Sequence, residues 1–276
     1  MDGPPPSIRA WRPDVPGVAE VLHAHFPRHA YPMHVHDTWT VLMVDAGTVR
    51  YDLERHEHAT GSTLVTLLPP GVAHDGRSVA GDGFRKRVLY LDADRIDPAR
   101  TGRAVDRPDW GDPVLRAELD RVHRVLSRPG DELEAESRLA LVTDRLSRHL
   151  AGVDPVAPEP RAPGLARRLR DLLDAHVVDG ITLEEAAATL GAHPTHLVRA
   201  FRREMGVAPH RYLTGLRLDR ARRRLLAGEP VAEVAVGVGF YDQSHLTRHF
   251  RRLIGVTPGA YAASGRCAVR RRLGPP

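Results

Sequence analysis

The feature that most restricts the fold of this chain is a pattern that occurs twice in its C-terminal part. Residues 183–213 and 231–262 match at positions 49 apart, and the two copies share a central His-Leu pair and a later Gly-Val-x-Pro sequence. In each copy a short Ala- or Val-rich segment ends at a glycine, Gly191 or Gly239, and a segment with one apolar and one basic face follows. This order of helix, turn and amphipathic helix is typical of a helix-turn-helix, so the repeat predicts two such units.

The second helix of each unit is predicted to bury one face and expose the other. Leu197 and Phe201 in the first copy, and Leu246 and Phe250 in the second, lie four residues apart and therefore share a stripe. An exposed helix face that carries arginine can enter the major groove of DNA, where arginine bonds guanine through two atoms. The predicted outward residues are Thr195, Val198, Arg199 and Arg202 in the first copy, and Gln243, Ser244, Thr247, Arg248 and Arg251 in the second.

Charge is divided unequally along the chain. Residues 161–276 contain 20 arginines and 10 acidic residues, whereas residues 1–160 contain 20 basic and 25 acidic residues. The net charge of +5 is therefore +10 in the C-terminal part and −5 in the remainder. Such a division suggests a polyanionic partner for the basic part alone, although a solvated arginine surface would have the same composition.

Residues 164–263 resemble the DNA-binding domain of the AraC/XylS family of bacterial transcription regulators. The segment GFYDQSHLTRHFRRLIGVTPGAYA (239–262) is the most similar to the family's signature. The resemblance implies that two recognition helices, joined by a long helix at about 209–227, enter successive major-groove segments of double-stranded DNA. It also implies RNA polymerase as a partner. By motif position it implies base contacts from Thr195, Val198, Arg199, Gln243, Ser244 and Arg248, and phosphate contacts from Arg202, Arg203, Arg251 and Arg252.

The two recognition helices are not expected to read DNA in the same way. Val198 cannot hydrogen-bond a base edge, so the first helix is expected to depend on Arg199 and on contact with thymine methyl groups. Phosphate contacts position a protein without specifying sequence. Helices are predicted at 164–178, 183–190, 194–204, 209–227, 231–237 and 243–253, with a short turn at 258–262 and with N-caps at Thr182, His193, Asp242 and Thr257.

The first half of the chain has a strand-like pattern. Strands are predicted at 18–26, 39–44, 48–53, 62–68 and 87–92, which suggests a β-sandwich or small barrel. Amphipathic helices follow at 114–127 and 133–150, separated by Gly130. They are expected to cover the barrel and to dimerise it, with packing inside one chain as the alternative. The apolar stripe concerned is Leu139, Leu141, Val142, Leu146 and Leu150.

The domain boundaries follow from these patterns. A sensing barrel is expected at 1–110, a helical segment at 111–151, a linker at 152–163, the DNA-binding domain at 164–263 and a basic tail at 264–276. The linker contains four prolines, which cannot continue a helix.

Histidines concentrate in the predicted barrel. His34 and His36 lie two residues apart on a strand and so share a face, and His74 follows a Pro-Pro-Gly turn. The runs MHVHDTWTVLMVDAG (33–47) and ATGSTLVTLLPPGVAHDG (59–76) resemble the cupin-like sensor domain of many AraC-type regulators. The resemblance implies a barrel with a central pocket for a small-molecule effector. The residues expected to line that pocket are His34, His36, Trp39, Tyr51 and His74.

Three histidines are also sufficient ligands for a divalent metal such as zinc, iron or nickel. The glutamate of the metal-cupin motif is missing, because Thr40 or Val41 stands at its expected place. No cofactor is therefore expected, and the histidines are assigned to a ligand or to one another. The alternative is a metal-dependent cupin sensor, or a cupin enzyme fused to a DNA-binding domain. That fusion, and the lack of a phosphate loop or nucleophile motif, favour a binding protein over an enzyme.

The expected fold is α+β with two domains, a cupin-like barrel with helices followed by an all-α tandem helix-turn-helix domain. The expected function is sequence-specific regulation of transcription, with activation as the family's commoner outcome, under the control of a small molecule. The single cysteine, Cys267, excludes an intrachain disulfide framework. No apolar run of about 18 residues and no signal-peptide pattern occurs, so a cytoplasmic protein without a membrane partner is expected.

Overall fold

The computed structural model describes residues 6–27, 30–54, 56–79, 83–153 and 164–263. Except for residues 152 and 153, the predicted linker lies outside the described residues, and so does the predicted basic tail. Contacts divide the chain into two compact units, one made of 1–127 and 138–159 and the other of 128–137 and 160–276. None of the described helices is both long and apolar enough to cross a membrane.

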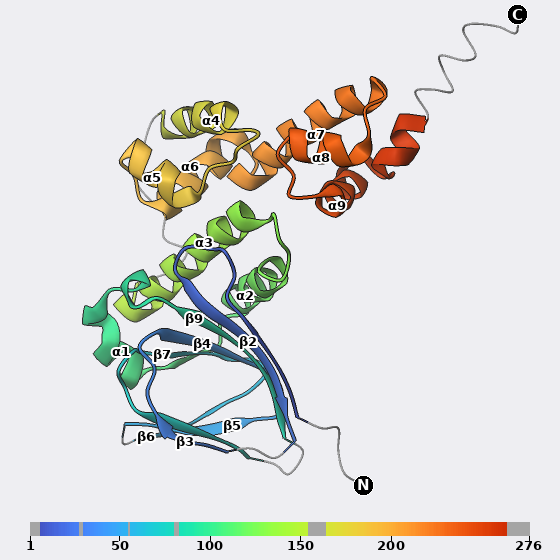
Figure 1. The fold of residues 1–276 in the computed structure, drawn as a ribbon. Coiled ribbons are helices and arrows are strands. Elements are labelled where there is room, and N and C mark those ends of the chain that lie inside the picture. The colour runs from blue at the N-terminus through green and yellow to red at the C-terminus, as the bar shows by residue number, and fades with distance from the viewer. Residues whose placement is uncertain (1–5, 28–29, 55, 80–82, 154–163, 264–276) are drawn as a thin grey trace, which may run out of the picture. The chain divides into compact units, whose positions relative to one another are not determined.

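The first unit is built on two antiparallel sheets (Figure 1). Within the described residues the larger sheet has the strand order β1-β2-β9-β4-β7-β10, and the smaller has the order β3-β8-β5-β6. All five predicted strands are present. The strands are β1 Ser7–Trp11, β2 Val18–Phe26, β3 Ala30–His34, β4 Trp39–Ala46, β5 Val49–Leu53, β6 His56–Thr60, β7 Val65–Leu68, β8 His74–Ser78, β9 Phe84–Leu91 and β10 Asp109–Trp110.

The side-chain pattern explains where these strands lie. The apolar runs in β4 and β7 are buried along their length, except for the last two residues of β4, as expected for strands covered on both faces. Strands β3, β6 and β8 belong to the smaller sheet and were not predicted, because sequences such as HEHAT and HDGRS are too polar to show an apolar alternation. Side chains from both sheets meet in shared clusters, for example Phe26, Val44, Val49 and Phe84.

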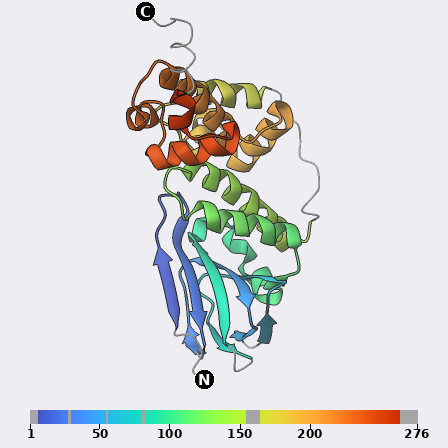
Figure 2. The ribbon, with the colours of Figure 1, turned by 90° about the vertical axis from the view of Figure 1, so that its right-hand side faces the viewer.

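Helices cover the outer side of the larger sheet (Figure 2). They are α2 Pro113–Val125 and the part of α3 Glu132–Ala151 that follows residue 137. The unit also contains α1 Thr101–Asp106, whose Val105 packs with Tyr51 and Leu53 of the smaller sheet, and short 3-10 turns at Ala93–Arg95 and Pro98–Arg100. The indole N–H of Trp11 in β1 donates to the carbonyl of Leu126, just after α2, at 3.0 Å. Most of the apolar stripe predicted to dimerise the barrel is already buried within the single chain, namely Leu139, Val142, Leu146 and Leu150.

The described part of the second unit is helical, as predicted. Its helices are α4 Leu165–Ala175, α5 Leu183–Leu190, α6 Pro194–Met205, α7 Pro209–Leu226, α8 Val231–Gly237 and α9 Gln243–Ile254, followed by a helical turn at 258–263. The four predicted N-caps are confirmed. Thr182 forms a capping box with Glu185, and the side chains of His193, Asp242 and Thr257 each accept a bond from a backbone N–H of the first turn.

The sequence repeat is also a repeat of packing. Phe201 of α6 and Phe250 of α9 are fully buried, and each meets a tyrosine edge-to-face. The ring centroids of Phe201 and Tyr212 are 5.5 Å apart, and those of Phe250 and Tyr261 are 5.4 Å apart. The predicted core stripes of the two recognition helices are therefore confirmed, and the expected α+β fold is confirmed with them.

Candidate nucleic-acid interface and ligand cavity

Helix α9 carries the second set of predicted base-contacting residues. It begins at Gln243 because the carboxylate of Asp242 accepts a bond from the backbone N–H of His245 at 2.6 Å. Gln243 and Ser244 are exposed on this first turn, while Leu246 is fully buried beneath it. The polar N-terminal turn of an anchored helix is the part that reaches base edges in a major groove.

Helix α6 presents fewer of its predicted residues. Arg199 is half-buried, but Thr195 and Val198 are each only 1% exposed. The prediction that Thr195 and Val198 face outward is therefore wrong for this structure. The buried residues of α6 run from Thr195 through Leu197 and Val198 to Phe201. At about 100° per residue these positions cover a wider arc than the stripe of Leu197 and Phe201 alone.

The four arginines predicted to contact phosphates all lie on exposed surface. Arg202 and Arg203 lie in the last turn of α6, and Arg251 and Arg252 lie in the last turn of α9. A guanidinium of Arg252 also bonds Nδ1 of His249 at 3.1 Å. Their exposure leaves their charges available to an anionic backbone.

Arg248, the remaining predicted base contact, is half-buried and paired with a residue that the sequence did not identify. Its guanidinium donates to Asp131 Oδ2 at 2.8 Å. Asp131 belongs to the same compact unit, through the segment 128–137, and its carboxylate also meets the Nε2 atoms of His245 and His249 at 3.2 and 2.8 Å. Three donors from one helix therefore converge on one buried carboxylate.

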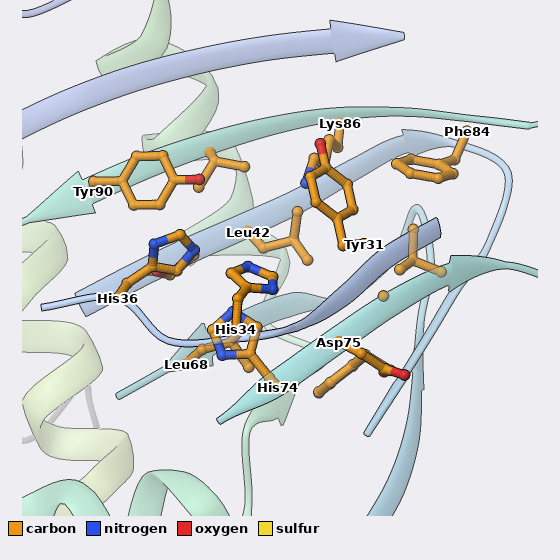
Figure 3. Close-up of a pocket in the computed structure, with 15 residues that line it drawn as sticks. Tyr31, His34, His36, Leu42, Leu68, His74, Asp75, Phe84, Lys86 and Tyr90 are labelled. Atoms are coloured by element: carbon orange, nitrogen blue, oxygen red, sulfur yellow. The ribbon is translucent and has the colours of Figure 1, made fainter. Parts of the chain in front are cut away.

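The first unit contains a cavity of about 80 Å³ between its two sheets (Figure 3). Strand β9 contributes alternate residues to its wall, so Phe84, Lys86, Val88 and Tyr90 all face the same way. The rest of the wall consists of Tyr31, His34, His36, Thr40, Leu42, Val49, Tyr51, Leu68, His74, Asp75 and Gly76. A concave site with an apolar lining and a few convergent polar groups is typical of a small-molecule site.

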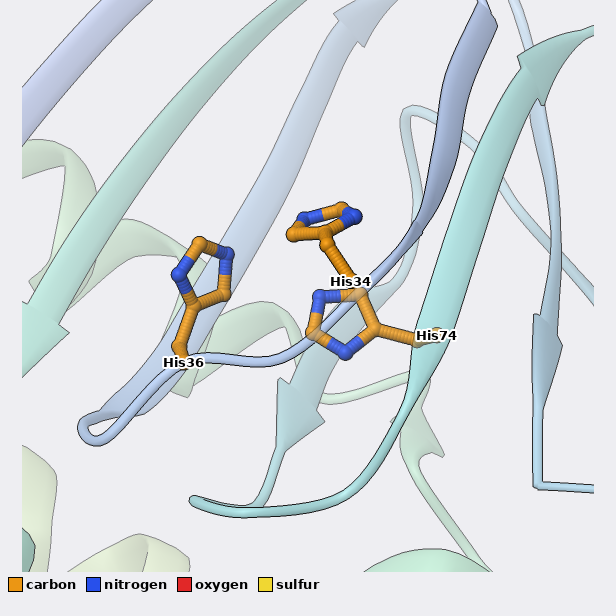
Figure 4. Close-up of side chains that lie close together, drawn as sticks. All are labelled: His34, His36 and His74. Carbon is orange, nitrogen blue, oxygen red and sulfur yellow. The ribbon is translucent and has the colours of Figure 1, made fainter.

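The three predicted histidines come together at one side of this cavity (Figure 4). The ring centroids of His34 and His74 are 4.5 Å apart, and one nitrogen from each of His34, His36 and His74 lies within 4.8 Å of the others. Nδ1 of His34 faces the carbonyl of Pro32 at 2.7 Å, and Nδ1 of His74 faces that of Val72 at 3.1 Å. A carbonyl can only accept, so each Nδ1 carries the proton and each Nε2 keeps a free lone pair.

Burial disfavours the charged forms of His74 and His36. It lowers the pKa of His74 to about 4, and it lowers the pKa of His36 as well, with a contribution from the neighbouring His34. Neutral rings with free Nε2 atoms can accept hydrogen bonds from a ligand or coordinate a metal.

The other two residues expected in the pocket are placed differently. Tyr51 lines the cavity, but its hydroxyl donates to Asp109 at 2.7 Å and so already has a partner. Trp39 does not line the cavity, because its ring is fully buried and its indole N–H donates to the carbonyl of Ala93 at 3.1 Å.

Lys86 and Thr40 are among the cavity residues that were not predicted from the sequence. Lys86 points into the cavity with its ammonium 4.0 Å from the centre of the Tyr31 ring. The hydroxyl of Thr40 is buried in the wall and has no hydrogen-bond partner among the described residues. The alternation of β9 would have placed Lys86 inside once that strand was assigned from Phe84 rather than from Arg87.

Comparisons with known proteins agree with both parts of the chain. A family model described as an AraC-like ligand binding domain matches residues 16–142, and one described as a helix-turn-helix domain matches residues 186–264. An uncharacterized HTH-type transcriptional regulator of Bacillus subtilis (strain 168), YbfI, is 25% identical over 222 residues, which cover 78% of this chain and 80% of that protein. A probable thc operon regulatory protein of Rhodococcus erythropolis is 33% identical over 76 residues, covering 28% of this chain and 23% of that protein. Among solved structures, the AraC-like transcriptional activator CuxR aligns with 83% of this chain and 82% of its own, at 18% identity and a TM-score of 0.43.

Proposed function

The chain belongs to the AraC-type family of DNA-binding transcriptional regulators, and we propose that it activates transcription at specific operators when a small molecule occupies the cavity of its ligand-binding domain. The observation that carries this proposal is the surface of α9. Gln243 and Ser244 are exposed on its first turn, above a fully buried Leu246 and Phe250, so polar side chains are held on a fixed helix.

Each side chain of this surface has a proposed role. Gln243, Ser244 and Arg248 read base edges from α9, and Arg199 does so from α6. Thr195 and Val198 would join them only in a state that exposes these two side chains. Arg202, Arg203, Arg251 and Arg252 contact phosphates and fix the position of the protein on the duplex.

Footprinting tests the proposal directly. The full chain is applied to the promoters that flank its own gene, and a discrete protected segment is expected, with a protection that changes when the effector is added. Uniform coating of the DNA without a protected segment would contradict a specific regulator.

Arg248 and Arg251 provide a matched pair of variants, because both are arginines of α9 and only the first is proposed to read a base. Arg248→Ala should cost roughly 1–3 kcal/mol at the operator and reduce the preference for it over a mutated operator. Arg251→Ala should weaken binding to both duplexes equally and lower the slope of log affinity against log salt by about 0.9. Titrations at several salt concentrations measure both effects. Unchanged discrimination by Arg248→Ala would remove this residue from the base-reading set.

The remaining parts of the proposal concern partners and location. RNA polymerase is the proposed partner at an activated promoter, and the cytoplasm is the proposed location, because a regulator must reach the chromosome. A homodimer also stays a prediction. Since the apolar stripe on α3 is largely buried within one chain, a dimer would have to use another surface, and light scattering of the full chain measures its presence.

A metal-dependent sensor or enzyme is the second candidate, and one observation favours it. His34 and His74 each direct Nδ1 to a backbone carbonyl, an arrangement that is common among metal-bound histidines. The cavity offers these histidines no glutamate at Thr40, however, and Lys86 adds a cation to the same wall. We therefore assign the cavity to the binding of an organic ligand, and stoichiometric metal in the purified protein would favour the second candidate instead.

A further inference from the structure

The first inference concerns the chemistry of the effector, and it rests on the proposed function. Lys86 is the only lysine in a chain whose lysines and arginines number 40. It stands on β9 between Arg85, which is exposed on the other face of the strand, and Arg87, which is paired with Asp45. Lys86, the one side chain with an ammonium group, therefore faces the cavity.

No carboxylate pairs with Lys86 in the described parts of the chain. Asp75 also belongs to the cavity wall, but its carboxylate accepts bonds from the backbone N–H of Asp52 at 2.7 Å and from Arg77 at 3.0 Å. The ring of Tyr31 is the neighbour of the ammonium group. A cation–π contact offsets only part of the cost of burying a charge, and burial lowers the pKa of Lys86 to about 8.

A second observation also indicates a ligand. The hydroxyl of Thr40, in a residue that is 5% exposed, lies in the same wall without a hydrogen-bond partner among the described residues. Buried polar groups are nearly always satisfied, so a wall that contains both an unpaired hydroxyl, opposite Tyr90, and an ammonium without a carboxylate marks a place that something else fills. On the other side of the cavity His34 and His74 offer free Nε2 lone pairs, which require a donor.

We propose that the effector is a small organic acid whose carboxylate pairs with Lys86 and whose hydroxyl or amino group donates to the histidines. The ammonium group supplies the charge that selects an anion. The Nε2 atoms of His34 and His74, which face away from the backbone carbonyls bound by Nδ1, select acids that carry a hydrogen-bond donor over those that do not.

The test uses small acids and their uncharged amides as matched probes. Glycolate, lactate and benzoate are compared with the corresponding amides, at millimolar concentration, on the full chain. Protection of the Lys86 amine from reductive methylation is measured by peptide mass spectrometry, which separates this single lysine from the α-amino group of the chain. At least one acid should slow the modification several-fold, and its amide should not. Equal protection by acid and amide, or protection by none of the acids, would overturn the proposal.

Three variants complete the test by calorimetric titration of the protecting acid. Lys86→Met should lose at least tenfold in affinity, whereas Arg85→Met, on the exposed face of the same strand, should bind as the wild type does. Lys86→Arg keeps the charge and should retain part of the affinity, which separates loss of charge from loss of fold. Normal binding of the acid by Lys86→Met would contradict this inference. If the wild-type protein still gives a discrete footprint on its operator, the proposed function remains intact.

An independent observation in the second unit supports a second inference. Asp131 is 7% exposed, and its carboxylate is bonded by His245, Arg248 and His249, all on α9. Nδ1 of His245 accepts a bond from the backbone N–H of Tyr241, and Nδ1 of His249 accepts one from Arg252. Both rings therefore carry their proton on Nε2 and donate it to Asp131, so the cluster is a hydrogen-bonded clamp rather than a set of free metal ligands.

The clamp is specific to the second recognition helix. The residue equivalent to His249 in the first copy is Ala200, and the one equivalent to His245 is the exposed His196. Gly130 precedes Asp131 with φ +89°, and a Cβ there would lie 2.1 Å from Nδ1 of His245. A residue with a side chain could not bring the loop this close to α9.

We infer that Asp131 masks Arg248 by holding Nη2 of its guanidinium, which DNA would otherwise bind, with its own carboxylate. One guanidinium edge cannot serve the buried carboxylate and a guanine or phosphate together, so DNA competes with Asp131. Residues 127 and 138, on either side of the segment, both belong to the ligand-binding unit. The masking segment is therefore continuous at both ends with the part of the chain that holds the cavity.

Removing the charge of Asp131 tests the mask. Asp131→Asn should bind a random-sequence duplex and the operator about tenfold more tightly, as expected when a charge-assisted bond no longer competes. The gain should disappear in the double variant Asp131→Asn, Arg248→Ala, measured against Arg248→Ala alone. Weaker or equal binding by Asp131→Asn, with an unchanged circular dichroism spectrum, or a gain that survives without Arg248, would overturn the inference. The random-sequence duplex keeps this result separate from the question of a specific operator.

Discussion

Phe250→Ala is expected to destabilise the second helix-turn-helix by about 3–5 kcal/mol, enough to unfold α9 at temperatures where the wild type is folded. The ring of Phe250 is fully buried in a cluster that includes Leu218, Leu225, Val234 and Leu246. Truncation removes the contacts of the ring and leaves a cavity that the surrounding helices can only partly fill. Because α9 is short, its stability comes from this packing rather than from the helix itself.

Leu253→Ala is the matched control, because Leu253 lies on the same helix and is 64% exposed. It should change stability by less than about 0.5 kcal/mol. Hydrogen exchange of the α9 amides in the full chain measures both variants without assuming that the two units unfold together. A loss of protection in Phe250→Ala no greater than that in Leu253→Ala would mean that the aromatic pair with Tyr261 does not hold the helix.

The repeat explains why so much of the second unit could be predicted from sequence. Two copies of one pattern confirm each other's boundaries, and each boundary also carries its own cap, such as Thr182 or Asp242. Predicted and observed helices therefore agree to within one to three residues at their ends. The two-sheet unit was harder to predict. Strands β3, β6 and β8 of its smaller sheet lack a regular apolar alternation, and their pairing depends on partners far away in sequence.

Two residues of the proposed sites, Lys86 and Asp131, could not be identified from the sequence, and the physical reason is the same for both. Lys86 and Asp131 are significant only because of what surrounds them. Lys86 lies in a cavity whose one acid, Asp75, is paired elsewhere, and Asp131 lies beneath a helix more than a hundred residues away. A lysine or aspartate in a sequence is most often a solvated surface residue, and neither has a local motif. Thr195 and Val198 were predicted to be exposed but are buried. A helical pattern gives the angle of each residue around α6 but not the width of the face that becomes buried.

Asp112→Ala is expected to destabilise the first unit by about 3 kcal/mol, because it removes one partner of a buried charge network and a helix cap together. The carboxylate of Asp112 accepts bonds from the backbone N–H groups of Val114 and Leu115, both at 3.0 Å, and so begins α2. The same carboxylate bonds Arg145 at 3.0 Å and His149 at 2.6 Å, which ties the start of α2 to α3. Asp94→Ala is the control in the same unit, because its carboxylate is 83% exposed, and it should have almost no effect.

The network also predicts how stability depends on pH. Burial by itself raises the pKa of Asp112, but the bonds from Arg145, the Leu115 backbone and His149 outweigh it and hold that pKa well below the usual range. A carboxyl with a depressed folded-state pKa stabilises the fold fully above its unfolded pKa of about 3.9 and loses that contribution as the pH falls further. The difference in unfolding free energy between the wild type and Asp112→Asn should therefore be constant from pH 7 to about 5 and shrink below about 4. Denaturant titrations across this range measure it, and a difference that grows on acidification would show that Asp112 is not held as an anion.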